Sequence, residues 1–311
     1  MSDRQENLRH LFIIFFNPRC QRIQASMSPD NQGPHVSIIL PARNSADGLP
    51  AALESILNQT YPDFELIIVD DGSTDTTPKL LAGLSDPRIV VIRHPVQFGI
   101  AHACNTGIGA ASGELVGFIS SGDEWDVRKL EEQVALFANL SPDYGVVYSD
   151  VWECTPAGNR AYRHTPEMTG LDLLNSYATD YQAGTLGTGP ILVRRSFLES
   201  AGPFDEQLRC FSDTDMIIRL QRLCRFHHME KPLCTSRSRD AHSLNPFDKS
   251  VSQLLLLQKY PETLENPVFL AHQLDRIGRN LRRAREGVPA ATGRVAQEQE
   301  HVHFRQPVSE L

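Results

Sequence analysis

Short apolar runs alternate with amphipathic segments from residue 36 onward. The apolar runs have the continuous hydrophobic character of buried parallel strands, and they lie at 36–40, 65–69, 88–92 and 115–119. The intervening segments are expected to be helices, because residues such as Leu49, Leu53 and Ile56 recur on one helical face. These helices are expected at 49–57, 77–84 and 100–111. The alternation predicts an open, mostly parallel α/β sheet with helices on both faces.

The pattern is less regular in the second half of the chain. Further strands are predicted at 146–148 and 191–193, and residues 150–195 are otherwise expected to form a long irregular excursion. A helix over 214–225 would bury Met216, Ile217, Leu220 and Leu223, and helices are also expected at 252–259 and 268–285. The predicted organisation is a disordered tail (1–34), an α/β domain (35–245), a C-terminal helical extension (246–286) and a second disordered tail (287–311).

Composition narrows the classes of function. A net charge of -8 argues against a general nucleic-acid binder, which would carry a basic footprint. The six cysteines are scattered without a CxxC pair, as expected for reduced thiols in a cytosolic protein. The apolar run at 11–16 is too short to span a bilayer. The run is either a weak membrane-surface anchor or the product of translation from a start upstream of the natural one. We favour the second explanation, because Met27 precedes the first strand.

Acidic side chains follow the second and fourth strands, at the edge where open parallel sheets bind ligands. Asp70 and Asp71 end the second strand, and their carboxylates either accept hydrogen bonds from a ribose and a base or cap the next helix. Asp123 and Glu124 follow the fourth strand. Carboxylate oxygens there suit Mg²⁺ or Mn²⁺ bridging a diphosphate, although a helix-capping role is the simpler alternative.

A third acidic cluster, at 212–215, opens the predicted helix that carries Arg219. Asp213 in this cluster either presents a general base to an acceptor hydroxyl or is simply a carboxylate that stabilises a helix start. No G-x-G-x-x-G follows the first strand, where residues 41–44 read Pro-Ala-Arg-Asn. This absence argues against a dinucleotide-binding oxidoreductase.

Several ordered motifs together resemble the family-2 glycosyltransferases, members of the nucleotide-diphospho-sugar transferase superfamily with the GT-A fold. The matching segments are 36–44, 54–62, 65–74, 105–107, 113–114 and 204–206. The resemblance covers roughly residues 36–245, and this many motifs at the proper separations are more specific than any one acidic pair. It implies a GT-A, Rossmann-like sheet and a glycosyltransferase activity.

The resemblance assigns donor-binding roles where the sequence matches. Pro41, Ala42 and Asn44 fall in the loop that contacts the nucleoside. Asp70 and Asp71 correspond to the carboxylates that bind the base and ribose. Asn105, in the matching segment 105–107, is assigned to nucleotide-sugar binding as well.

The catalytic and metal positions match the family less completely. Asp213 takes the place of the catalytic base, although Ser212 stands where the family has Glu. The family's acidic metal motif, Asp-x-Asp-Asp, reads Ser-Ser-Gly-Asp at 120–123. Asp123 therefore keeps a metal-ligand position, with Glu124 as a possible second carboxylate. His242 aligns loosely with a late histidine that reaches the diphosphate, and a surface histidine fits equally well.

These residues imply an inverting transfer of a sugar from a nucleotide-diphosphate donor, with a UDP-sugar preferred, to a hydroxyl of a glycan or lipid-linked acceptor. The expected process is the synthesis of cell-surface polysaccharide or lipid-linked glycan. Mg²⁺ or Mn²⁺ is the expected cofactor, and the degenerate motif leaves metal-independent binding open. It also supports an alternative, a catalytically weakened or inactive nucleotide-binding pseudo-glycosyltransferase that acts through protein partners.

The expected location is the cytoplasm, and peripheral contact with the inner face of the cell membrane remains open. Four arginines near the C-terminus bear on this question, at positions 279, 282, 283 and 285. They either touch anionic lipid or form a solvated helix face.

Overall fold

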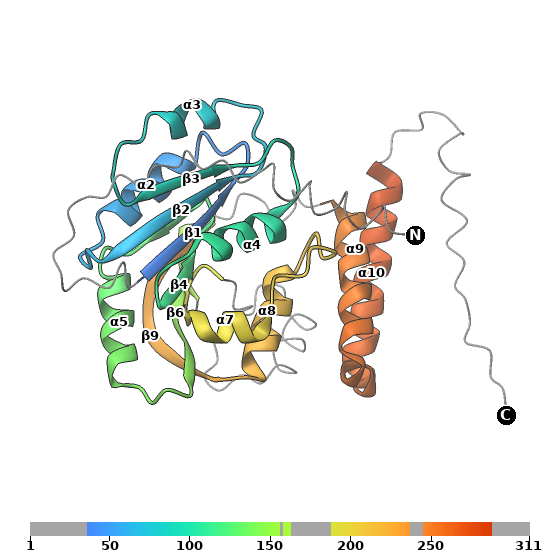
Figure 1. Ribbon diagram of the computed structural model, residues 1–311. Helices are drawn as coiled ribbons and strands as arrows, with labels where there is room; N and C mark the ends of the chain where they lie inside the picture. The colour runs from blue at the N-terminus through green and yellow to red at the C-terminus, as the bar shows by residue number, and fades with distance from the viewer. Residues whose placement is uncertain (1–35, 156–157, 163–187, 237–244, 288–311) are drawn as a thin grey trace, which may run out of the picture. The chain divides into compact units, whose positions relative to one another are not determined.

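The computed structural model describes residues 36–155, 158–162, 188–236 and 245–287. Their strands form one mixed sheet (Figure 1). The strands are β1 (Val36–Ala42), β2 (Phe64–Asp70), β3 (Ile89–Arg93), β4 (Leu115–Phe118), β5 (Asp123–Trp125), β6 (Tyr144–Thr155), β7 (Gly158–Tyr162), β8 (Ile191–Arg194) and β9 (Arg225–Ser236). The helices are α2 (Leu49–Leu57), α3 (Thr77–Ala82), α4 (Ile100–Ala110), α5 (Lys129–Asn139), α7 (Arg195–Ala201), α8 (Ser212–Gln221), α9 (Pro246–Lys259), the 3₁₀ helix η1 (Pro261–Glu265) and α10 (Pro267–Gly287).

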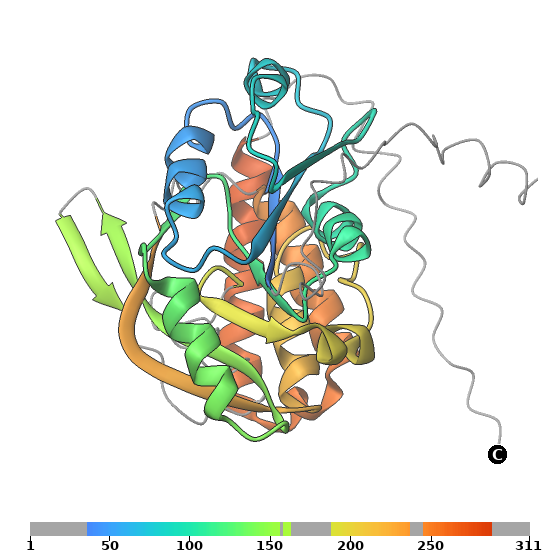
Figure 2. The same cartoon turned by 60° about the vertical axis from the view of Figure 1, so that its left-hand side comes forward.

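The strand order is β3-β2-β1-β4-β8-β6-β9-β5, with β7 paired to β6. The first four strands are parallel, as the sequence predicts, and β6 and β9 form a second parallel pair. Antiparallel β8 joins the two parts between β4 and β6, and β5 runs antiparallel to β9. The paired ends of β6 and β7 project from the sheet in Figure 2.

The chain builds outward from β1 to β3 and then returns to place β4 on the other side of β1. This reversal makes the β1–β4 boundary a topological switch point, where the carboxyl ends of strands leave a crevice for ligands. In the register of this pair, Ile39 lies opposite Phe118, so the loops after both strands open at the same edge. The fold therefore places the loops that begin at Arg43 and Ile119 beside each other.

Both faces of the central strands are buried under helices. Ile38 and Leu40 pack with Leu53 and Ile56 of α2, whereas Ile39 packs with residues of α4 and α8 on the opposite face. Successive residues of a strand point to opposite faces, so the continuous apolar run of β1 fills both layers. The predicted arrangement of helices on both faces of an α/β sheet is thereby confirmed.

The second half of the chain departs from the predicted boundaries. Helix α8 ends at Gln221, and Leu223, which was expected on its buried side, is 45% exposed. The chain must leave the helix there because β9 begins at Arg225. Helix α9 begins earlier than expected, at Pro246, where the Asn245 side chain accepts a hydrogen bond from the Phe247 N–H (2.9 Å).

Helices α9 and α10 pack against α8 through a small apolar cluster. Its centre consists of Leu256 of α9, Tyr260 directly after α9, Phe269 and Ile277 of α10, and Ile218 of α8. The division of the chain at residue 245 remains a prediction, and the predicted tails lie outside the described residues apart from Gly287. Among the helices that the structure describes, none combines the length and apolarity needed to cross a bilayer.

Candidate functional site

A cavity of about 680 Å³ opens at the carboxyl edge of β1, β2 and β4. Pro41 and Ala42 line it from the end of β1, and Asp71 lines it from the end of β2. Further walls come from residues 97–101, from Ser120 and Ser121 after β4, and from the segment 206–210. Its volume lies in the range of small-molecule sites, and its position is the switch point of the sheet. The sequence-predicted donor edge is therefore a real concavity in the structure.

Asp71 is a buried acceptor that shapes one wall of this cavity. Its Oδ1 accepts a hydrogen bond from the Phe98 N–H (2.9 Å), and its Oδ2 accepts one from the Gly99 N–H (2.8 Å). The same Oδ1 lies 2.9 Å from His94 Nδ1. Burial alone would raise the pKa of Asp71, but these hydrogen bonds outweigh it and hold the pKa below its ordinary value. Asp71 is therefore ionised and fixes the loop at 97–99.

Asp70 has a different environment, although it is adjacent in sequence. It is fully buried, and its Oδ1 accepts a hydrogen bond from the Ser73 N–H (2.9 Å). Its Oδ2 lies 3.3 Å from Arg93 Nε. Asp70 is not among the described residues that line the cavity. It holds the turn that presents Asp71, and its direct contact with a ribose or base remains a prediction.

His94 is a site residue that the sequence reading missed. It follows β3 as Asp71 follows β2, so the rule of inspecting strand ends could have found it. Its Nε2 lies 3.1 Å from Thr106 Oγ1 of α4, while its Nδ1 faces Asp71. The imidazole thus connects the carboxylate to the helix behind the cavity.

Asn44 connects the loops that follow β1 and β2. Its backbone is in the left-handed region (φ 47°), which Asn tolerates better than most residues. Its Oδ1 accepts a hydrogen bond from the Thr74 N–H (2.8 Å), and its own N–H donates to Ser73 Oγ (2.9 Å). The side chain is therefore committed to loop geometry. The cavity is lined by Pro41 and Ala42 at the end of β1 and by Arg43 and Ser45 on either side of Asn44.

Asn105 on α4 holds the segment that begins at Phe204. Its Nδ2 donates to the Phe204 carbonyl (3.0 Å) and to Glu206 Oε1 (2.9 Å), and its Oδ1 accepts from the Phe204 N–H (2.7 Å). Glu206 lines the cavity, and Asn105 is not among the cavity's described residues. Hydrogen bonds from Asn105 and His102 hold the pKa of Glu206 below its ordinary value. Asn105 thus positions a carboxylate at the cavity wall.

Asp213 lies in the first turn of α8 and is half-buried. Its Oδ1 accepts a hydrogen bond from the Thr214 N–H (2.8 Å). Burial raises its pKa, and that hydrogen bond only partly opposes the shift. Burial raises the pKa of Cys104 on α4 and of Cys210, which lines the cavity, and the charge of Asp213 makes a smaller contribution in the same direction to both shifts. The carboxylate therefore lies beside the cavity wall, and its raised pKa suits a general base.

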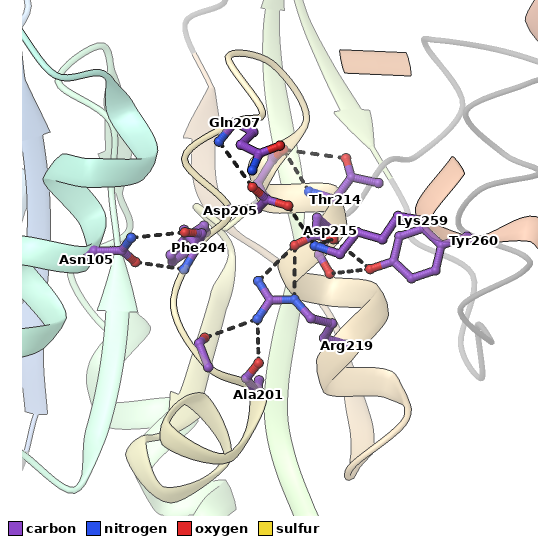
Figure 3. Close-up of polar contacts among 12 residues, drawn as sticks. Asn105, Ala201, Phe204, Asp205, Gln207, Thr214, Asp215, Arg219, Lys259 and Tyr260 are labelled. Atoms are coloured by element: carbon purple, nitrogen blue, oxygen red, sulfur yellow. Dashed lines mark hydrogen bonds and ion pairs between the residues drawn. The ribbon is translucent and has the colours of Figure 1, made fainter. Parts of the chain in front are cut away.

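Asp215, two residues further along α8, is a buried hub that the sequence reading did not identify (Figure 3). Its Oδ2 accepts from Arg219 Nε (3.0 Å), one helical turn away. Its Oδ1 accepts from the Tyr260 hydroxyl (2.6 Å) and lies 2.7 Å from Lys259 Nζ. Lys259 Nζ also donates to Asp205 (2.9 Å). This network attaches α9 to the helix that carries Asp213. The i, i+4 spacing of Asp215 and Arg219 was the one feature of the sequence that indicated the network.

Asp123 and Glu124 lie in β5, opposite Ser236 and Thr235 of β9. A Cβ placed on Gly189 would lie 3.7 Å from Asp123 Oδ2, which locates the carboxylate beside the segment before β8. Among the residues that the structure covers, no cluster of three or more His, Cys, Asp or Glu is placed to hold a metal ion. His242 lies outside the described residues. The hard oxygens of Asp123 and Glu124 suit Mg²⁺ or Mn²⁺, and they make at most a minimal site.

Beneath β5 lies Lys129, a fully buried lysine that the sequence pattern did not single out. Its Nζ donates to Gln133 Oε1 (2.6 Å) and lies 4.2 Å from the centre of the Trp125 ring. Burial lowers its pKa to about 7. Trp125 is buried, and its indole N–H donates to the Gly189 carbonyl (3.2 Å). Lys129 and Trp125 thus support the strand that carries Asp123.

Known proteins resemble this chain in sequence. Among curated relatives, the UDP-Glc:alpha-D-GlcNAc-diphosphoundecaprenol beta-1,3-glucosyltransferase WfgD of Escherichia coli is 38% identical over 112 residues, 35% of this chain and 44% of that protein. A PGL/p-HBAD biosynthesis glycosyltransferase of Mycobacterium bovis is 32% identical over 193 residues, 60% of this chain and 73% of that protein. The chain thus spans less than half the length of the first of these relatives.

Solved structures and a family model complete the comparison. Staphylococcus aureus TarS in complex with UDP-GlcNAc superimposes with a TM-score of 0.61 at 21% identity, over 78% of this chain and 72% of that chain. A mannosyltransferase from Pyrobaculum calidifontis, in complex with GDP-Man and Mn²⁺, gives a TM-score of 0.54 at 20% identity, over 85% of this chain and 79% of that chain. These similarities show the GT-A fold. The model of glycosyl transferase family 2 matches residues 37–202, more than half of the chain, and the protein therefore belongs to that family.

Proposed function

We propose that this protein transfers a sugar from a nucleotide-diphosphate donor to a hydroxyl acceptor with inversion at the anomeric carbon. The observation that carries the proposal is the cavity at the β1–β4 switch point, which has the ionised Asp71 in its wall and Asp213, with its raised pKa, beside it. Asp71 is held ionised by its hydrogen bonds, whereas the raised pKa of Asp213 suits it to accept a proton. Two carboxylates with such different environments are suited to different roles.

The proposed donor is a UDP-sugar. Support comes from the UDP-Glc donor in the E. coli relative's name and from the TarS complex with UDP-GlcNAc. Pro41, Ala42 and Asp71 line the cavity and would contact the nucleoside. Asn44 and Asp70 would act behind them by holding the two loops in register.

Mg²⁺ or Mn²⁺ is the proposed cofactor, with Asp123 as its protein ligand and Glu124 as a second carboxylate. When bound there, the ion would supply positive charge to the donor's diphosphate. The Mn²⁺ complex of the Pyrobaculum neighbour supports this proposal. Few protein ligands are needed, because Mg²⁺ retains several waters and takes oxygens from substrate phosphates.

In the proposed reaction, Asp213 accepts the proton of the acceptor hydroxyl as that oxygen forms a bond to the anomeric carbon. The bond from this carbon to the diphosphate oxygen breaks, and its electron pair leaves with the nucleoside diphosphate. A raised pKa makes Asp213 a stronger base than an exposed aspartate. Because the base must be ionised, activity should rise as pH increases through that raised pKa.

The proposed acceptor is a lipid-linked glycan, and the proposed location is the cytoplasm with peripheral contact at the membrane. The diphosphoundecaprenol acceptor in the E. coli relative's name supports this class, as does the role of the M. bovis relative in PGL/p-HBAD biosynthesis. A hydroxyl on such a carrier sits at the bilayer surface, so the enzyme must work there.

The test compares wild type with Asp213→Asn for UDP binding by calorimetry and for turnover with a UDP-sugar. General-base catalysis contributes about 10²–10⁴-fold, so turnover should fall by that factor while UDP binding is retained. Asp143→Asn, an exposed change before β6, is the matched control and should retain both. Wild-type UDP binding without transfer from any donor would instead identify a nucleotide-binding pseudoenzyme. Undiminished turnover in Asp213→Asn would refute the assigned base.

A further inference from the structure

Helices α9 and α10 lie side by side (Figure 1), and they run antiparallel because residues later in α9 contact residues earlier in α10. Ser250 Oγ donates to the Ile277 carbonyl (3.4 Å), and Gln253 Nε2 donates to Gln273 Oε1 (3.4 Å). Leu256 of α9, Tyr260 directly after it and Phe269 of α10 turn instead towards α8. Each helix therefore has one side against α8, one side against its partner and one side left over.

The remaining side of α9 is apolar and exposed. Phe247 and Leu254 are 47% and 49% exposed, and Val251 between them is exposed as well. Their spacing is i, i+4 and i+7, which places all three on one face of the helix. An amphipathic helix of a globular protein normally carries polar residues on such a face.

The remaining side of α10 continues this surface. Leu274 and Leu281 are 54% and 40% exposed, and they lie seven residues apart on one face. On both helices the α8-facing side, the partner-facing side and the exposed apolar side follow one another in the same rotational order along the chain. Because the helices run antiparallel, this shared order places both apolar sides on the same outer surface of the pair. The five apolar residues therefore lie on one outer surface, which we call the hairpin face. It comprises Phe247, Val251, Leu254, Leu274 and Leu281.

Basic residues border the hairpin face. Arg285 is four residues after Leu281 and continues the same helical line, and it is exposed. The guanidinium of Arg282 would lie 3.9 Å from a Cβ placed on Gly278, so it folds back beside this line. Helix α10 carries five arginines against Asp275 and Glu286, a net charge of +3 in a chain whose net charge is -8.

We propose that the hairpin face docks on an anionic lipid surface. Exposed apolar side chains beside arginines have the composition of an interfacial helix, whose apolar side enters the bilayer while its basic residues contact lipid phosphates. Pairing with a second copy of the chain would instead bring two +3 helices together. The charge therefore favours a negatively charged surface over self-association.

Docking in this way also orients the cavity. Asn245 and Asp248 line the cavity, and they flank Phe247 at the start of α9. The rim of the cavity is thus within two residues of the hairpin face. This consequence rests on the proposed function, because it explains how a lipid-linked acceptor would reach the site.

The test measures co-sedimentation of the full chain with phosphatidylcholine vesicles, with and without phosphatidylglycerol. Wild type should bind the anionic vesicles and bind neutral ones much more weakly. Arg282→Gln/Arg285→Gln should weaken the anionic binding roughly 30-fold, because each basic residue at such a surface strengthens binding about fivefold. Leu274→Ser/Leu281→Ser should weaken it about tenfold or more.

Two control variants are matched to these changes. Arg128→Gln/Lys231→Gln removes two exposed charges elsewhere, and Leu223→Ser changes a leucine of similar exposure. Both should bind vesicles like wild type. Absence of wild-type binding, or equal binding by the hairpin-face variants, would overturn the proposal, and the latter would point to another segment such as 11–16. Self-association in light scattering that is lost in Leu274→Ser/Leu281→Ser, without vesicle binding, would assign the face to a second copy. None of these readouts depends on sugar transfer.

Discussion

Replacing Lys129 by Met should change how the stability of the fold depends on pH. The Lys129 amine is fully buried, and its nearest polar partner is Gln133 Oε1 at 2.6 Å. The Cys234 thiol of β9, whose own pKa is raised by burial, is a titratable group that also acts on the amine. Burial lowers the pKa of Lys129 from 10.5 to about 7 because the charged amine is poorly solvated there. Methionine fills a similar volume without a titratable group.

The size of the effect follows from the two pKa values. A pKa that falls from 10.5 to about 7 corresponds to about 5 kcal/mol of preference for the neutral amine. Below pH 7 the amine is protonated in both the folded and the unfolded protein. The folded protein then bears the full free-energy cost of burying the charged amine. Between pH 7 and 10.5 the unfolded chain binds more protons, so stability rises with pH. Between pH 7 and pH 9 this proton linkage raises the free energy of unfolding of wild type by about 2 kcal/mol, and Lys129→Met lacks this increase.

The assay is urea unfolding of wild type and Lys129→Met at both pH values. The stability of wild type relative to the variant should increase by about 2 kcal/mol between pH 7 and pH 9. The lost contacts with Gln133 and Trp125 affect both pH values and do not produce this difference. Lys79→Met, at an exposed position on α3, should leave the pH dependence of wild type unchanged. An identical pH dependence in wild type and Lys129→Met would refute the reasoning.

Two further predictions concern the site and its support. Tyr260→Phe removes the 2.6 Å hydrogen bond to Asp215 and should lower the free energy of unfolding by about 1.5–3 kcal/mol in urea titrations. An unchanged unfolding midpoint would argue against the hub. Asp71→Asn leaves one carbonyl oxygen for the N–H groups of Phe98 and Gly99, so calorimetry should show UDP binding about tenfold weaker. Wild-type affinity in that variant would remove Asp71 from the donor site.

The first half of the fold was predictable because its signals are local. Strands β1, β2 and β4 are buried on both faces and read as continuous apolar runs. By contrast, the sequence pattern predicted neither β5 nor β9. Strand β5 has three residues, two of them acidic, and β9 includes His-His-Met-Glu-Lys-Pro at 227–232. These strands exist because they pair with each other and with β6, which no local pattern records.

The candidate site was predictable to the level of loops, and less so to the level of side chains. The strand-end rule found the turn at Asp70 and Asp71, but only the structure shows that Asp71 lines the cavity and Asp70 lies behind it. The resemblance assigns Asn105 to the donor, which remains a prediction, and only the structure shows that both ends of its amide bond to Phe204. Lys129 was not singled out because lysines are ordinarily solvated and no local pattern marks a buried one. In each case tertiary contacts decide the role.

The measurement that tests the central claim most directly is mass spectrometry of a polyprenyl-diphosphate-linked sugar after incubation with a panel of UDP-sugars. Wild type should add the mass of one sugar from one of these donors. Asp213→Asn should form product at least about 10²-fold more slowly. No product with any donor, or equal rates for the two proteins, would contradict the account.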